Sequence, residues 1–200
     1  MKITSIKQQV KRQDRYSVFI DGKYCFSLSD RALLDSKIVS GQEVDEQQIK
    51  EFKTLSANDK AYGNALRYVA LRPRSVWEME TYLKRKQVDK SVSQEIISKL
   101  TNLEFLDDTE FANSWVQNRR LLKPVSRRRL TQELRQKQVA SDIIENVLAD
   151  DPTDETDILS EIIKQKRRQT KYQDNLKLMQ YLARQGFSYD DIKAALQETS

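Results

Sequence analysis

The spacing of apolar residues predicts helices over most of the chain. From Ala57 onward, apolar residues recur three or four positions apart, which places them on one face of a helix. One predicted helix covers residues 58–71. A second begins at Ser75-x-x-Glu78, where the serine oxygen and the glutamate can each bond an unpaired amide at the helix start. One face of this second helix is lined by Val76, Met79 and Leu83.

This helical pattern occurs three times. Residues 71–88 and 122–139 share Leu, Pro and Ser at matching positions and end in Lys-Gln-Val, with a shift of 51 positions between them. A fainter copy follows 48 positions later, where Leu130, Leu134 and Val139 correspond to Leu178, Leu182 and Phe187. An apolar pair four residues apart closes each copy, as Ile96/Leu100, Ile144/Leu148 and Ile192/Leu196. The period predicts three homologous three-helix units, each burying its apolar face partly against its neighbours.

The first 56 residues follow a different pattern. Residues 16–20 and 24–28 alternate apolar and polar side chains around Asp21-Gly22, and this dipeptide between alternating runs predicts a β-hairpin. Ile3 to Val10 is a candidate third strand, and residues 29–35 and 45–55 are predicted short helices separated by Gly41. Because a small ribbon is marginally stable alone, we expect it to pack on these helices. It also offers an exposed sheet edge.

We therefore predict a mainly α-helical fold made of tandem three-helix repeats behind a small N-terminal β-hairpin and helix element. The predicted limits are 1–56 for the N-terminal element and 57–104, 105–151 and 152–200 for the three repeats. The single Cys25 excludes an internal disulfide and is expected to be a small buried side chain. No apolar stretch approaches the roughly 18 residues of a membrane span, and the N-terminus lacks a signal-peptide core, which favours the cytoplasm.

Charge is strongly banded along the chain. Residues 111–139 hold eight Lys or Arg against one acid, residues 140–161 hold eight acids and no base, and residues 162–171 are basic again. Such a band suggests a polyanion or an acidic protein surface as partner, although a solvated helix face offset by its acidic neighbour would also explain it. The predicted partner-binding residues are Arg119, Arg120, Lys123, Arg127, Arg128, Arg129, Lys166, Arg167 and Arg168.

Residues that carry catalysis are missing from the sequence. There is no histidine, the single cysteine cannot form a zinc site, and no glycine-rich phosphate loop occurs. The acids Asp107, Asp108 and Glu110 could form a metal or acid–base cluster, but a helix cap with Leu106 and Phe111 as a hydrophobic staple explains them better. We therefore predict no enzyme, no metal and no cofactor, and rank a carboxylate metal nuclease last.

Several motifs in chain order resemble the RecX regulators of bacteria. They are Arg72–Ser75, Phe105–Trp115, Arg128–Lys137 and Gln185–Ile192, and the resemblance covers about residues 58–197. The N-terminal hairpin resembles the extension of Gram-positive members. Glu104 and Gln138 depart from the family pattern, because glycine is usual at both positions. The resemblance implies an elongated, curved array of three-helix units that binds in the groove of the RecA filament on single-stranded DNA. It also implies lower ATPase, strand-exchange and co-protease activity of RecA.

A second hypothesis is a sequence-independent DNA-binding protein that acts without RecA, because three-helix units resemble helix-turn-helix modules and the basic band could contact phosphates. Weak direct DNA binding is compatible with both hypotheses. A monomer is expected, since no coiled-coil heptad occurs. Aromatic residues could stack on nucleic-acid bases, but packing between helices is the preferred interpretation for each. They are Trp77, Tyr82, Trp115, Tyr181 and Tyr189.

Overall fold

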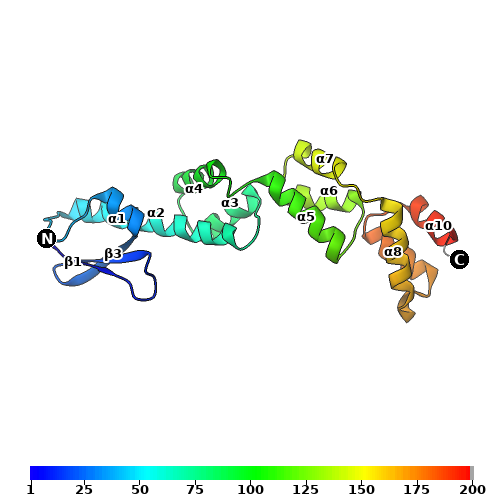
Figure 1. Cartoon of the computed structure of the whole chain (residues 1–200), viewed down its shortest axis with the longest axis horizontal. Helices are drawn as coiled ribbons and strands as arrows, with labels where there is room; N and C mark the ends of the chain where they lie inside the picture. Colours follow the sequence, from blue (N-terminus) through cyan, green and yellow to red (C-terminus); the bar gives the residue numbers. More distant parts are fainter. Residues whose placement is uncertain (199–200) are drawn as a thin grey trace. The chain divides into compact units, whose positions relative to one another are not determined.

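The computed structural model describes residues 1–198 (Figure 1), and the chain forms two compact units. The first unit comprises Met1–Arg72 and Glu80–Phe105, and the second comprises Pro73–Met79 and the residues from Leu106 onward. The described part is mostly helical and has one small antiparallel sheet at its N-terminal end, as the sequence predicts.

The sheet has three strands in the order β1-β2-β3, which are Ile3–Gln8, Arg15–Ile20 and Lys23–Ser29. The predicted hairpin is confirmed: Asp21 and Gly22 both have positive φ, 47° and 79°, as a tight turn between two twisted strands requires. The candidate third strand is also confirmed. Its outer edge is partly covered, since Ile3 exchanges backbone hydrogen bonds with Gly41 and Gln42.

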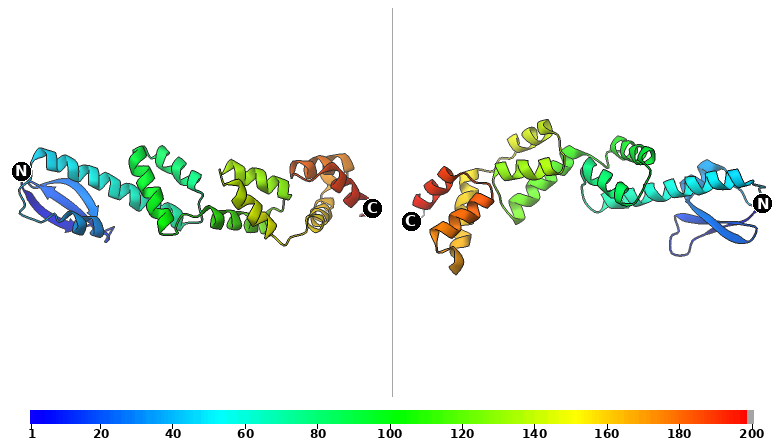
Figure 2. Two further views of the ribbon diagram at one scale, coloured as in Figure 1. Left: turned by 90° about the horizontal axis from the view of Figure 1, so that it is seen from above. Right: turned by 180° about the vertical axis from the view of Figure 1, so that it is seen from behind.

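The sheet packs on α1 (Asp30–Ser36) and on the first half of α2 (Glu46–Ala70), as both views of Figure 2 show. Val18, Phe26 and Leu28 form the centre of this core, and Phe52 of α2 packs against it. Cys25 is half-buried at the margin of the same core. The helices therefore supply the apolar surface that the ribbon lacks by itself.

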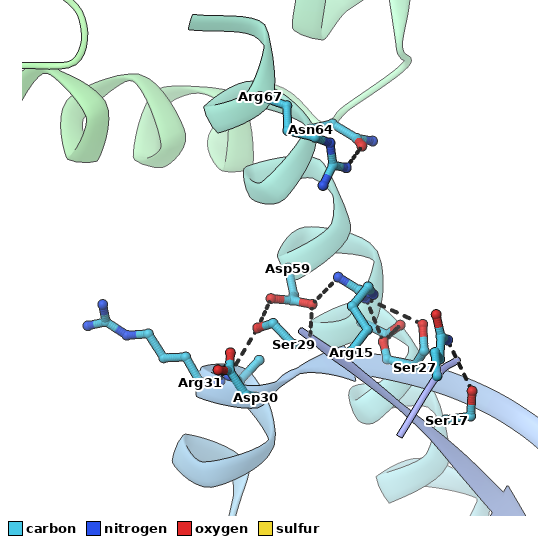
Figure 3. Close-up of polar contacts among 12 residues, drawn as sticks. Arg15, Ser17, Ser27, Ser29, Asp30, Arg31, Asp59, Asn64 and Arg67 are labelled. Atoms are coloured by element: carbon cyan, nitrogen blue, oxygen red, sulfur yellow. Dashed lines mark hydrogen bonds and ion pairs between the residues drawn. The ribbon is translucent and has the colours of Figure 1, made fainter. Parts of the chain in front are cut away.

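Helix α2 corrects one prediction. The two helices expected at 45–55 and 58–71 are one continuous helix of 25 residues, and the predicted limit between residues 56 and 57 falls inside it. The polar residues near that point contact the sheet. Ser56 Oγ donates to the Ser27 carbonyl at 2.6 Å, and Asp59 pairs with Arg15 at 2.9 Å and accepts from Ser29 Oγ at 2.6 Å (Figure 3). The polar residues around position 57 are therefore explained by contacts with the sheet and do not mark a break between two helices.

The remaining helices make up the three repeats. The first repeat uses the end of α2 with α3 (Val76–Arg85) and α4 (Lys90–Asn102). The second consists of α5 (Asp108–Leu122), α6 (Arg127–Gln136) and α7 (Ser141–Ala149). The third consists of α8 (Glu155–Arg167), a short 3₁₀ turn (Thr170–Tyr172), α9 (Asn175–Arg184) and α10 (Tyr189–Glu198). The predicted limits 104/105 and 151/152 fall between helices, and residues 199–200 of the last segment lie outside the described residues.

The apolar residues that define the repeat are buried as predicted. Each apolar pair that closes a repeat is at most 8% exposed, and so are the matching apolar residues of each second helix. The second and third repeats each have their own cluster of buried apolar residues, as expected of a chain built from repeated units. The buried members of the pattern are Met79, Leu83, Ile96, Leu100, Leu130, Leu134, Ile144, Leu148, Leu178, Leu182, Ile192 and Leu196.

The second helix of every repeat ends in the same way. The second residue after the helix end has positive φ, 56° in Gln87, 56° in Gln138 and 96° in Gly186. The next amide then bonds back across the last turn, for example Val139 N–H to the Leu134 carbonyl at 3.2 Å. Glu104 ends α4 with a φ of 59°, so a side chain occupies a left-handed position at three of these four helix ends. At each second helix, we call the residue directly after the helix and the left-handed residue that follows it the receiving end of the repeat. The three receiving ends are Lys86-Gln87, Lys137-Gln138 and Gln185-Gly186.

Within the second unit, two receiving ends contact the start of the preceding repeat's second helix. Ser126 N–H donates to the Gln185 carbonyl at 3.1 Å, and a Cβ at Gly186 would lie 2.3 Å from Ser126 Oγ. Lys137 Nζ lies 2.8 Å from Glu78 Oε1, in the first turn of α3. The two caps at these helix starts, Ser75 and Ser126, are fully buried.

Acids from the next repeat complete each joint. Val76 N–H donates to Asp108 Oδ1 at 2.8 Å, and Arg127 N–H donates to Glu155 Oε1 at 2.9 Å. Both donors are first-turn amides that have no partner inside their own helix. Both acceptors stand at the first position of a following helix, where a carboxylate is favoured by the helix dipole. The same bond therefore joins successive repeats twice.

None of the helices between residues 1 and 198 combines the length and the apolar character that a membrane crossing requires.

Replacing Gly186 by Ala should destabilise the fold by roughly 2–3 kcal/mol, because the new Cβ meets the Ser126 side chain and the backbone stays left-handed. Replacing Gln138 by Gly should instead stabilise by about 0.5 kcal/mol, since glycine relieves the same strain at an exposed site. Urea unfolding measures both changes. Gln138→Ala is the matched control, and equal effects of Gly186→Ala and Gln138→Ala would contradict this joint.

Candidate partner-binding surface

Two of the predicted partner-binding residues are engaged inside the second repeat. Arg120 is half-buried, with its side chain only 11% exposed, and both Nε and Nη2 donate to Asp151 Oδ2, at 2.9 and 2.7 Å. Arg119 pairs with the buried Glu133 at 2.8 Å and is 30% exposed. These arginines connect α5 to the rest of their repeat, so their position favours a role in stability over one in partner binding.

Lys166 and Arg167 are the equivalents of Arg119 and Arg120 in the third repeat, when the helix caps Asp107 and Asp154 are aligned. They too make contacts inside their repeat. The Lys166 ammonium lies 4.8 Å from the Tyr181 ring centre, and Arg167 donates to the carbonyls of Tyr172 and Gln173. The basic character of these positions therefore serves the repeat fold.

The contact between the first and second helices changes chemistry from repeat to repeat. In the first repeat, at the matching positions, Tyr68 and Tyr82 stack with ring centres 4.2 Å apart and planes at 7°. In the second it is the Arg119–Glu133 ion pair, and in the third the Lys166–Tyr181 cation–π contact. A stack, an ion pair and a cation–π contact thus fill one structural role, which the sequence pattern alone does not reveal.

The remaining predicted residues differ in exposure. Lys123, Arg128 and Arg168 are exposed, and in residues 1–198 no ion pair involves any of them. Arg127 is half-buried and donates to the Asp151 carbonyl, while Arg129 is 3.3 Å from Glu133. Of the predicted residues, Lys123, Arg128 and Arg168 are therefore the three that are exposed and take part in no ion pair of the described residues, and we call them the exposed basic set.

A third run of cations was missed by the sequence analysis. Lys84 and Arg85 end α3 in the first unit, Lys86 follows them, and all three are exposed. The signal for them is the same as for Arg127–Arg129, three consecutive basic residues. The charge of this region is not banded as it is after residue 110, so charge banding does not single it out.

The acids near residue 107 act as predicted for a helix cap. Asp107 Oδ1 accepts from the amides of Thr109 and Glu110, and Leu106 and Phe111 are buried. Asp108 is the acceptor for Val76 across the joint. Within the part of the chain that the structure describes, no group of three or more potential metal ligands occurs.

The aromatic residues mostly pack, as predicted. Lys137 lies 5.6 Å from the Trp77 ring centre and 5.5 Å from that of Trp115, beside its bond to Glu78. Tyr181 packs against the third core. The packing prediction is wrong for Tyr189, which is 65% exposed at the start of α10.

The Asp151 carboxyl has a shifted pKa. Burial by itself raises the pKa of this group, but the hydrogen bonds from Thr153 and Arg120, together with the Arg120 charge, outweigh burial. The pKa of Asp151 in the folded state therefore lies below its ordinary value. The stabilisation from this shift is present above the ordinary pKa of Asp, about 3.9, and is lost as the pH falls through the lower folded-state value.

Replacing Arg120 by Leu should destabilise the protein by about 3 kcal/mol at neutral pH, because it leaves the Asp151 carboxylate buried without its cation. Chemical unfolding measures the change, and Arg128→Leu, which alters an exposed arginine, should shift stability by no more than about 0.5 kcal/mol. The Arg120→Leu deficit should shrink below about pH 4, as Asp151 is protonated. Equal effects of the two substitutions on stability would contradict a stabilising role of Arg120 and leave it available for partner binding.

Known proteins resemble the chain along its whole order of elements. Four domain models of one family match the chain, one after another in chain order. The regulatory protein RecX N-terminal domain matches residues 1–45, and the first, second and third RecX three-helix domains match residues 61–100, 107–148 and 154–196. The chain is also similar to a crystal structure of regulatory protein RecX, with a TM-score of 0.72, 26% identity and coverage of 98% of both chains. A crystal structure of RecX from Lactobacillus salivarius matches 70% of this chain and 95% of that chain, with a TM-score of 0.59 and 25% identity.

Relatives with the same name extend over most of the chain. Regulatory protein RecX of Lactobacillus johnsonii is 38% identical over 146 residues, which are 73% of this chain and 54%, about half, of that relative's length. That of Bacillus pumilus is 34% identical over 205 residues, which cover 98% of this chain and 76% of the relative. The chain belongs to the RecX family of regulatory proteins.

Proposed function

We propose that this chain is a non-enzymatic regulator that binds the RecA filament on single-stranded DNA and mostly inhibits RecA ATPase, strand exchange and co-protease activity. The observation that carries the proposal is the match of four RecX domain descriptions in order along the chain. The relatives bear the name regulatory protein, which accords with a binding role.

The mechanism that we propose uses many modest contacts. The exposed basic set lies on two successive repeats, with Lys123 and Arg128 in the second and Arg168 in the third. A repeat protein that touches several protomers of a polymer gains affinity by effective concentration, without any single strong contact. Occupying the filament in this way hinders its function and requires no chemical step by the bound protein.

Direct DNA binding is the second candidate, favoured by the exposed cations of both units. Lys84, Arg85 and Lys86, like the exposed basic set, can approach phosphates without breaking an ion pair that the fold uses. Such binding would be independent of sequence and strongly dependent on salt. It would also operate without RecA, which is how the two candidates are told apart.

The wild-type chain should lower RecA ATPase on single-stranded DNA when titrated into the assay, and unchanged ATPase at saturation would count decisively against the proposal. Replacing the exposed basic set by glutamate, as Lys123→Glu, Arg128→Glu and Arg168→Glu, should raise the concentration for half-inhibition about tenfold. The shift should be greatest at low salt, because exposed charges are screened as ionic strength rises.

The control carries the same charge change on another helix, as Lys50→Glu, Lys53→Glu and Lys60→Glu of α2, all exposed. It should inhibit within about twofold of the wild type. Equal inhibition by the exposed-set variant and the control would refute the site assignment and leave the function standing. A steep fall of bare-DNA affinity with salt, together with unchanged ATPase, would support the second candidate instead.

A further inference from the structure

The receiving end of the first repeat has the same backbone geometry as the one that binds Glu78. Gln87 and Gln138 share a φ of 56°, and the amides that follow them bond back to Leu83 and Leu134 at 3.1 and 3.2 Å. The residue that precedes the left-handed position is lysine in both, Lys86 and Lys137. The two ends therefore present the same cation on the same helix terminus.

In the second and third repeats, this end is occupied by the start of another helix. Lys137 binds the Glu78 carboxylate at 2.8 Å, and the Gln185 carbonyl accepts from Ser126 N–H at 3.1 Å. The serine cap of each incoming helix is fully buried. A receiving end is thus a built docking site for a helix start, and its basic form takes a carboxylate at the third position of that helix.

In the first repeat, the same end is uncovered. Lys84, Arg85, Lys86 and Gln87 are all exposed, and no ion pair in residues 1–198 involves these three cations. The segment before α2 folds as a sheet and a short helix, so it does not supply a preceding three-helix repeat. The sequence places three cations here, against two, Arg135 and Lys137, at the equivalent positions of the second repeat, of which Lys137 bonds Glu78.

The neighbouring aromatic residues do not form an open stacking platform. Tyr82 has one face against Tyr68, with ring centres 4.2 Å apart, and both rings are half-buried. The Arg85 guanidinium and the Lys86 ammonium lie 6.0 and 5.9 Å from the Tyr82 ring centre. This contact holds the cations near the helix end rather than leaving a ring for a nucleic-acid base.

A second copy of the chain is also a poor occupant. The exposed second-helix start is that of α9, where Asp174 is the cap and Lys177 stands at the position of Glu78. Docking α9 on the first repeat would bring Lys177 towards three cations, and such like charges repel. Charge complementarity therefore favours a helix start that carries an acid in its first turn.

We propose that the Lys84–Gln87 end of the first repeat binds such a helix start on a partner protein, in the way that Lys137 binds Glu78. The inference rests on the proposed function, in which the partner is the protein of the RecA filament. It assigns to the first unit a protein-binding surface that is separate from the exposed basic set.

The test compares wild type with the variant Lys84→Gln, Arg85→Gln, Lys86→Gln and with the matched control Lys50→Gln, Lys53→Gln, Lys60→Gln. Glutamine keeps helix propensity, and circular dichroism and urea unfolding check that each variant is folded. Fluorescence anisotropy of the labelled proteins measures binding to RecA filaments on single-stranded DNA and to the same DNA without RecA. We expect filament binding to weaken about tenfold in the Lys84–Lys86 variant only, with affinity for bare DNA lowered no more than in the control.

Each other outcome overturns something definite. If wild type binds the filament and the Lys84–Lys86 variant binds equally well, the inference fails while the proposed function stands. Equal loss on filament and bare DNA would make this surface a nucleic-acid contact and overturn the inference. If wild type does not bind the filament, the proposed function fails and the inference fails with it.

A photoreactive benzoylphenylalanine in place of Gln87 gives a second readout. The cross-link reports the contact at this position directly, so a general loss of stability cannot imitate it. Gln87 is exposed and already has a side chain at its left-handed position, so the substitution is compatible with the fold. Irradiation on the filament should cross-link a partner peptide that contains a helix start with Asp or Glu in its first turn. Cross-links confined to helix interiors or to DNA would contradict the proposed mode of docking.

Discussion

The fold of the repeats depends on one recurring contact, the start of a second helix held by its neighbours. At that start, the first amides have no partner inside the helix, so each needs an acceptor from elsewhere. Asp108 and Glu155 supply it for Val76 and Arg127, and both acids also stand at the favourable first position of their own helix. The receiving ends complete the contact on the other side. Local helix chemistry and the joining of repeats thus use the same residues.

Contacts within and between the repeats decide which charges are left for a partner. Lys137, Arg119, Arg120, Lys166 and Arg167 all satisfy carboxylates, carbonyls or aromatic rings within the second unit. A count of basic residues along the chain therefore overstates the number of cations that are free of contacts inside the fold. What remains exposed without an ion pair is a smaller set, spread over both units, and it is on this set that the proposed binding to a nucleoprotein filament depends.

Much of the fold could be predicted because its signals are local. The Asp21-Gly22 turn, the Asp107 cap and the apolar periods each depend on residues a few positions apart, and all appear in the structure. The continuity of α2 could not be predicted, because the polar residues Ser56 and Asp59 look like a joint until the sheet is placed against them. Tertiary contact overrides the local pattern there.

The contacts of the candidate binding residues could be predicted less well, for a related reason. Arg120 and Asp151 are 31 positions apart, and no pattern in the chain indicates that they pair. The Tyr68–Tyr82 stack hides the equivalence of these positions with Arg119–Glu133, because the side chains share a place in the repeat but no chemistry. Lys84–Lys86, in contrast, are visible in the sequence as three consecutive basic residues, and the backbone geometry that Gln87 shares with Gln138 indicates a role for them.

Native-state hydrogen exchange of three equivalent amides tests the central claim most directly. Val76, Arg127 and Asn175 each begin the second helix of a repeat, and such first-turn amides normally exchange rapidly. If acids of the next repeat hold the helix starts, the amides of Val76 and Arg127 exchange slowly and that of Asn175 exchanges fast. Exchange of Val76 and Arg127 as fast as that of Asn175 would contradict the account.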